Sequence, residues 1–141
     1  NDNNDIIGGQ TFISPSEVDL ECIEVLTSVV AAPGKVLMTL HDFDTQLDSW
    51  GPILGSASVD LTRTDNGKWK SFNISGLHLS KGKAYGFRLE CPNTYIGVGE
   101  AARSSENPPL FKGREWKFTN NGQTGRSFSY FSLAFKIDAK A

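Results

Sequence analysis

Residues 84–91 alternate between apolar and polar side chains, and this pattern restricts the possible folds more than any other feature of the sequence. One side of the segment carries Tyr85, Phe87, Leu89 and Cys91, and the other carries Gly86, Arg88 and Glu90. A period of two fits a β-strand with one buried face, because successive side chains of a strand point to opposite sides. The segment is therefore predicted to be a strand whose apolar side faces a core.

Shorter segments of the same kind recur along the chain between glycine, proline and asparagine turns, a spacing typical of sandwiches and barrels. Further strands are expected at residues 10–13, 18–30, 36–42, 56–62, 69–74, 95–99, from residue 116, and at 128–137. Helical patterning is almost absent. The connections are predicted to be antiparallel hairpins.

Three local features refine this prediction. The alternation in residues 18–30 places Val18, Leu20 and Cys22 on one face and then changes phase, which predicts a β-bulge. Asp65-Asn66-Gly67 predicts a hairpin turn, because Asn-Gly accepts positive φ angles. Residues 44–55 are expected to form a long loop.

A chain of 141 residues has the length of one domain with a buried core. We therefore predict an all-β, antiparallel two-sheet β-sandwich of the lectin-like jelly-roll class over residues 10–141. Residues 1–9, which open with the polar run Asn1-Asp2-Asn3-Asn4-Asp5, are expected to be a linker or a disordered N-terminus.

The charged residues are scattered, with 14 basic and 16 acidic side chains and a net charge of −2. Binding of nucleic acid needs clustered Lys and Arg, so it is disfavoured. No apolar run has the length of a transmembrane helix, so membrane insertion is also not expected. Cys22 and Cys91 allow two interpretations, a pair of buried thiols or a disulfide.

The order of several motifs resembles the jelly-roll accessory modules of secreted bacterial glycan-processing proteins, and the resemblance covers roughly residues 10–137. The motifs are Gln10-Thr11-Phe12, Gly51-Pro52-Ile53-Leu54, the Trp-containing 69–74 strand, the 79–89 element and Leu133-Ala134-Phe135. The resemblance implies a carbohydrate-binding or spacer module, located outside the cell, in the periplasm or at the cell surface. It names no ligand, because fold does not fix function.

Candidate ligand-binding residues follow from the chemistry of sugars, which stack an apolar face on aromatic rings and bond their hydroxyls to planar polar groups. Arg88, Glu90 and His41 share the outward side of the central strands, together with Thr39. The candidate aromatic platforms are Trp50, Trp69 and Tyr95, while Trp116 is expected in the core. The alternative for each is ordinary packing or a solvated ion pair.

The carboxylates of Asp42, Asp44 and Asp48 are candidate calcium ligands, because three hard oxygen donors follow one another at loop spacing. The EF-hand pattern fails, since Leu47 and Ile53 occupy its glycine and glutamate positions. A structural calcium of the kind found in lectin-like jelly rolls is the hypothesis, and solvated acids beside a turn are the alternative. No other cofactor is expected.

Catalytic signals are weak, because no nucleophile elbow or distinct pair of carboxylates stands out. We predict a non-catalytic carbohydrate-binding accessory module of a secreted or surface glycan-active protein. Its expected partners are a polysaccharide or glycan and the neighbouring domains of the parent chain. Two alternatives stay open, a structural spacer that packs on a neighbouring catalytic domain and a small independent hydrolase.

Overall fold

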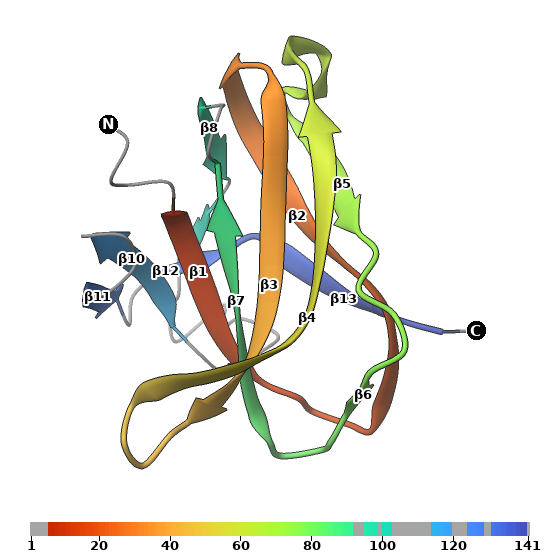
Figure 1. Cartoon of the computed structure of the whole chain (residues 1–141), viewed down its shortest axis with the longest axis vertical. Helices are drawn as coiled ribbons and strands as arrows, with labels where there is room; N and C mark the ends of the chain where they lie inside the picture. The colour runs from red at the N-terminus through yellow and green to blue at the C-terminus, as the bar shows by residue number, and fades with distance from the viewer. Residues whose placement is uncertain are drawn as a thin grey trace.

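The computed structural model describes residues 6–91, 95–98, 100–102, 114–119, 124–128 and 131–140. Two antiparallel sheets pack against each other, with the front sheet in Figure 1 ordered β11-β10-β1-β7-β3-β4. Its strands are β1 (Ile6–Ile13), β3 (Gly34–Asp44), β4 (Ser49–Leu61), β7 (Ala84–Glu90), β10 (Glu115–Thr119) and β11 (Thr124–Phe128). The prediction of an all-β antiparallel sandwich is confirmed.

The rear sheet has the order β13-β2-β5, and β6 and β8 also pair with its long strand β2. Its strands are β2 (Val18–Ala32), β5 (Lys68–Phe72), β6 (His78–Leu79), β8 (Tyr95–Val98) and β13 (Phe135–Ala139). A separate pair is formed by β9 (Glu100–Ala102) and β12 (Phe131–Leu133). In the part of the chain that the structure describes, no helix has the length and apolar character needed to span a bilayer.

The core lies between the two sheets and uses the side chains that the alternation placed inward. From the front sheet, Phe87 and Leu89 on β7 and Met38 on β3 are fully buried. From the rear sheet, Phe135 meets Phe87 with ring centroids 5.4 Å apart. The predicted inward faces of residues 84–91 and 36–42 are therefore confirmed.

The bulge predicted in β2 is present. Leu20 pairs with Ala139 while Cys22 pairs with Asp138, so β2 carries one extra residue there. This shift lets both Leu20 and Ile23 face the core. It also turns Cys22 to the outer side, where its thiol donates to Asp138 Oδ2 at 3.2 Å, so the prediction that Cys22 shares a face with Leu20 is wrong. Cys22 and the other cysteine, Cys91, are both buried, and they are not joined in a disulfide.

The turn at Asp65-Asn66-Gly67 joins the two sheets instead of closing a hairpin, because β4 lies in the front sheet and β5 in the rear sheet. Asn66 has φ −54° and ψ 129°, and Gly67 has φ 73°, which are values of a type II turn with one positive φ. Asn66 Oδ1 accepts a hydrogen bond from the Val30 amide at 2.6 Å. The turn follows the short helix η1 (Arg63–Asp65) and is tied to β2.

The prediction of a long loop over residues 44–55 is wrong, because β4 begins at Ser49 and only residues 45–48 form a turn. The alternation that marks other strands is missing here. Between Gly55 and Trp50, β4 has an extra residue relative to β3 at two places. Such irregularities hide a strand from a period-two pattern and bend it.

Candidate functional site

The two irregularities bend the β3–β4 hairpin out of the plane of the front sheet. Pro52, which has no amide to donate to a ladder, lies in this bent region. Figure 1 shows the start of β4 crossing in front of β7 and β3. We call residues 43–52 the arm. It lies over the outer face of the sheet to which it belongs.

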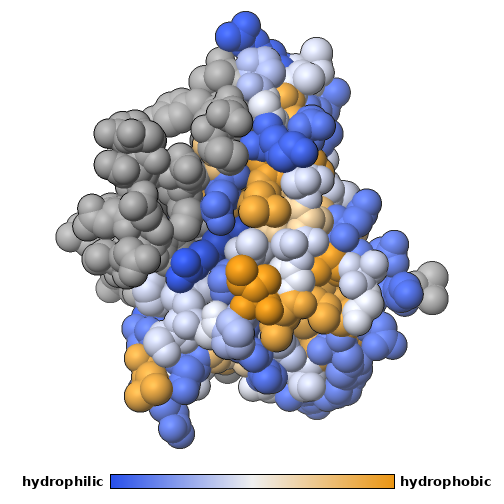
Figure 2. Space-filling view, viewed as in Figure 1, coloured by the Kyte–Doolittle hydropathy of each residue, from blue (hydrophilic) through white to orange (hydrophobic). Residues whose placement is uncertain are grey.

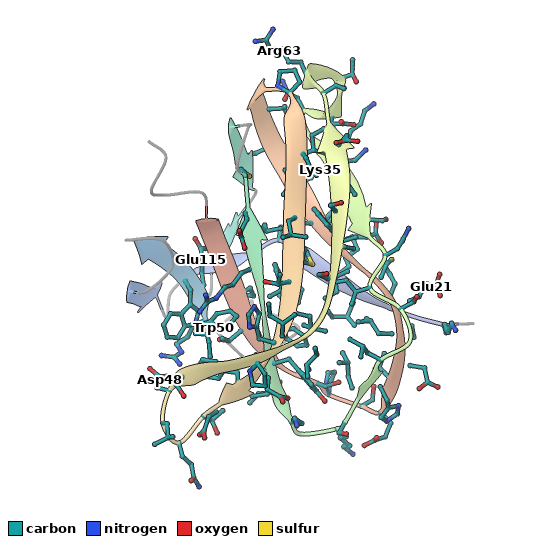
Figure 3. All side chains as sticks on the ribbon, in the orientation of Figure 1. Glu21, Lys35, Asp48, Trp50, Arg63 and Glu115 are labelled. Carbon is teal, nitrogen blue, oxygen red and sulfur yellow. The ribbon has the colours of Figure 1, made fainter. Side chains whose placement is uncertain are left out.

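Trp50 fixes the arm to the sheet by lying against Gly86 of β7. A Cβ at position 86 would be 2.5 Å from Trp50 Cζ3 and 2.6 Å from Cη2, so only glycine leaves room for this ring. The Arg88 guanidinium carbon lies 4.7 Å from the ring centroid, a cation–π distance. Figure 3 shows Trp50 between the arm and the sheet.

Other aromatic rings surround Trp50 on the outer face. Its ring meets His41 at 5.4 Å, and Phe43 and Trp116 at 5.8 Å each, all in edge-to-face arrangements. Such pairs stabilise beyond the area that they bury. Trp116 is buried as predicted, but in this outer cluster and not between the sheets.

His41 links the sheet to the backbone of the arm. Its Nδ1 lies 3.0 Å from the carbonyl oxygen of Gly51. A carbonyl only accepts, so Nδ1 carries the proton and Nε2 accepts from the Thr39 hydroxyl at 2.8 Å. Burial lowers the pKa of His41, and the nearby Arg88 lowers it further, while the bond to Gly51 acts in the opposite direction. The ring is therefore held in its neutral form.

An ion pair closes the arm at its tip. Arg114, which precedes β10, donates to both carboxylate oxygens of Asp48. Its guanidinium carbon also lies 5.1 Å from the Trp116 ring centroid and 5.9 Å from that of Phe43. We call the Arg114–Asp48 pair the latch.

A hollow of about 660 Å³ opens between the arm and the turn that leads into β7. Its volume falls in the range of small-ligand sites. It is lined by Ile13, Asp42, Phe43, Asp44, Thr45, Gln46, Ser49, Gly51, Pro52, Gly82, Lys83 and Ala84. The lining combines apolar side chains with two carboxylates, an amide, two hydroxyls and an ammonium group.

The predicted ligand-binding residues do not all meet. Arg88, His41 and Trp50 come together under the arm, and Glu90 follows Arg88 on the same side of β7. His41 is buried, with both nitrogens engaged inside the protein.

The other two predicted aromatic platforms belong to the rear sheet. Trp69 lies on β5, is 38% exposed, and has Lys136 Nζ 4.2 Å from its ring centroid. Tyr95 begins β8, and its side chain lies outside the described residues. Trp69 does not contribute to the lining of the arm's hollow.

The three predicted calcium ligands have separate partners. Asp42 pairs with Lys83 at 3.1 Å, and Asp48 pairs with Arg114. Asp44 Oδ1 accepts from the amides of Gln46 and Leu47 at 2.9 and 3.0 Å, which closes the turn at the arm tip. Among the described residues these carboxylates do not gather into a ligand set, so calcium binding here stays a prediction.

Cys22, Glu24 and Asp138 form a different cluster, on the outer side of the rear sheet, with potential ligand atoms within 4.8 Å of one another. Burial and the hydrogen bond to Asp138 raise the pKa of the Cys22 thiol to about 11. The hydrogen bond with Asp138 also raises the pKa of Glu24. Cys22 and Glu24 therefore hold their protons to a higher pH than the isolated groups would.

The sequence did not indicate the role of Phe43, Lys83 or Arg114. Phe43 and Lys83 line the hollow, and Arg114 closes the latch. The sequence held one weak signal, because a phenylalanine at position 43 has the outward parity of His41, where a solvated face would carry a polar residue. In the structure Phe43 is only 8% exposed. Its partners come from segments 7 to 73 residues away, beyond the reach of a local pattern.

Comparisons of the chain with protein-family models, with curated proteins and with solved structures gave no match.

Proposed function

We propose that this domain is a non-catalytic carbohydrate-binding module and that it binds its glycan in the hollow beside the arm. The observation that carries the proposal is the composition of the lining, in which Phe43, Ile13 and Pro52 lie beside Asp42 and Lys83. A sugar ring offers an apolar C–H face and equatorial hydroxyls, so it needs both kinds of surface in one place.

The polar groups of the hollow suit hydroxyls because several remain exposed. Thr45, Gln46 and Ser49 are exposed on the arm, and Gln46 carries both a donor and an acceptor. Lys83 is half exposed beside its partner Asp42, and an ammonium–carboxylate pair can bond a hydroxyl as donor and acceptor at once. The hollow is open to solvent, as binding of a polymer chain requires.

Lys83→Met tests the proposal against Lys35→Met, a matched change of an exposed lysine at the far end of the front sheet (Figure 3). Affinity gel electrophoresis and a glycan array identify the glycan that the wild-type protein binds. Titration of each variant with that glycan then gives its Kd. We expect Lys83→Met to weaken binding by about tenfold, the effect of one charged hydrogen bond. Lys35→Met should leave Kd unchanged. Equal Kd values for both variants would move the site elsewhere.

A spacer role is the second candidate, favoured by exposed apolar side chains. Leu47 at the arm tip is 74% exposed and Ile53 on β4 is 60% exposed. Figure 2 shows apolar patches among polar surface over β3 and β4. Absence of retention on every polysaccharide, together with tight packing against a neighbouring domain of the parent chain, would favour the spacer. Hydrolysis of chromogenic glycosides would favour the enzyme alternative.

A further inference from the structure

We infer that Trp50 is a positioning residue, which together with Gly86 and the Arg114–Asp48 latch holds the arm where it forms one wall of the hollow. The effect that we expect on glycan affinity rests on the proposed function. The structural part of the inference, that these residues set the position of the arm, is independent of any ligand.

The direction of side chains along the arm carries the argument. Ser49 and Gly51 line the hollow, and Trp50 between them does not. Adjacent residues of a strand face opposite sides, and Trp50 faces the sheet, where Gly86 makes room for its ring. Trp50 therefore acts on a ligand only through the arm. In this proposal Trp50 positions the arm, whereas the sequence alone makes it a candidate sugar platform.

Two further contacts hold the same wall. The His41 imidazole donates to the Gly51 carbonyl at 3.0 Å, and Gly51 lines the hollow. At the tip, the latch joins Asp48 to Arg114, which lies outside the β3–β4 hairpin. The arm is thus attached at its base, its middle and its tip. An arm displaced from the sheet would remove Asp44, Gln46 and Ser49 from the site together.

Gly86→Ala is the decisive variant. The added Cβ meets the Trp50 ring at 2.5 Å, and Gly86 has no positive φ angle, so alanine is otherwise acceptable in β7. We expect faster hydrogen exchange in residues 43–52 and a Kd about tenfold higher, since a wall in place one tenth of the time lowers affinity in that proportion.

Gly76→Ala is the matched control. A Cβ there meets open space, but the φ of +83° strains any other residue, so the change lowers stability without touching the arm. In Gly76→Ala, exchange in residues 43–52 should then rise only as much as the loss of global stability raises exchange elsewhere in the domain. Unchanged exchange in the arm of Gly86→Ala, relative to Gly76→Ala, would overturn the inference.

Asp48→Asn gives a second measurement that leaves the core intact. Asp60→Asn, an exposed carboxylate at the other end of β4, is its control. Because the latch is exposed, we expect a two- to fivefold rise in Kd, about the effect of a surface ion pair, and faster exchange at the arm tip. Identical exchange in both variants would remove the latch from the inference.

The two proposals fail differently. If the wild-type protein binds no glycan, the proposed function fails, and exchange in residues 43–52 still decides whether Trp50 and Gly86 position the arm. If Gly86→Ala loosens the arm and Kd stays the same, the positioning role for binding is wrong while glycan binding stands.

Discussion

The front sheet carries an apolar cluster on each of its faces, and the two are built differently. Between the sheets, aliphatic and phenylalanine side chains such as Leu40 and Phe87 fill alternate positions of regular strands. On the outer face, Phe43 and Trp50 of the bent arm gather with Trp116 of β10, beside two arginines. The inner cluster is needed for the sheets to pack. The outer cluster attaches the arm to the sheet.

The largest effect is expected from the inner cluster. Phe87 is fully buried and contacts Phe135 across the two sheets. Phe87→Ala should lower the free energy of unfolding by about 3–5 kcal/mol, the range for truncating a large core side chain. Urea denaturation followed by circular dichroism measures it, with Ser58→Ala on exposed β4 as control. A loss below about 1 kcal/mol would contradict this assignment of the core.

Trp50→Ala should have a smaller and more local effect. Trp50 is partly buried and belongs to the outer cluster, so we expect a loss of about 1–3 kcal/mol. Hydrogen exchange should rise in residues 43–52 and stay slow in β7. The two clusters would instead form one cooperative unit if Trp50→Ala lowered the free energy of unfolding as much as Phe87→Ala and raised exchange equally throughout the domain.

Acid should loosen the outer cluster before the inner one. The folded pKa of His41 lies below the ordinary value of 6.5, chiefly because of burial. Its contribution to stability is therefore present above pH 6.5 and is lost as the pH falls toward the folded pKa. Exchange in the arm should therefore accelerate as the pH falls below about 6.5. His41→Gln removes the titrating ring. After correction for the pH dependence of intrinsic exchange, exchange in the arm of this variant should not accelerate as the pH falls.

His78, an exposed residue of β6, should give the smallest effect and the opposite sign. Hydrogen bonds to Asp19 and Glu17 raise its pKa above 6.5. Its stabilisation is present below pH 6.5 and is lost as the pH rises through the raised pKa. Because the groups are exposed, only a slight decrease in Tm with rising pH is expected. The dependence should vanish in His78→Gln, and a dependence of the reverse sign would disprove the pairing.

The sequence predicts the inner cluster well and the outer cluster poorly, for the same physical reason. A regular strand repeats every two residues, so the burial of Tyr85, Phe87 and Leu89 follows from the local pattern. Even the bulge in β2 leaves a readable change of phase. The irregularities between Trp50 and Gly55 remove that pattern and make a strand resemble a loop.

The candidate site depends on coincidences across long separations in the sequence. The sequence predicts that Arg88 and His41 share the outward side of the central strands, and it gives Trp50 as a separate aromatic candidate in a loop. The structure brings the three side chains together. The position of the Trp50 ring against Gly86 could not be predicted, because no pattern near residue 50 reveals it. Arg114 reaches Asp48 across 66 residues. Such contacts depend on which strands the topology of the sheet places side by side, so the sequence near each residue does not predict them.

The place of β1 in the front sheet has a consequence for how the chain acquires its structure during synthesis. β1 pairs on one side with β7 and on the other with β10, whose residues come more than seventy positions later. The backbone N–H and C=O groups of β1 stay unpaired until both partner strands have been synthesised. Pairing between strands so far apart in the sequence is also slow to form. A nascent chain that has emerged only as far as β4 exposes β1 as an unpaired strand, so association with other chains is the hazard at that stage.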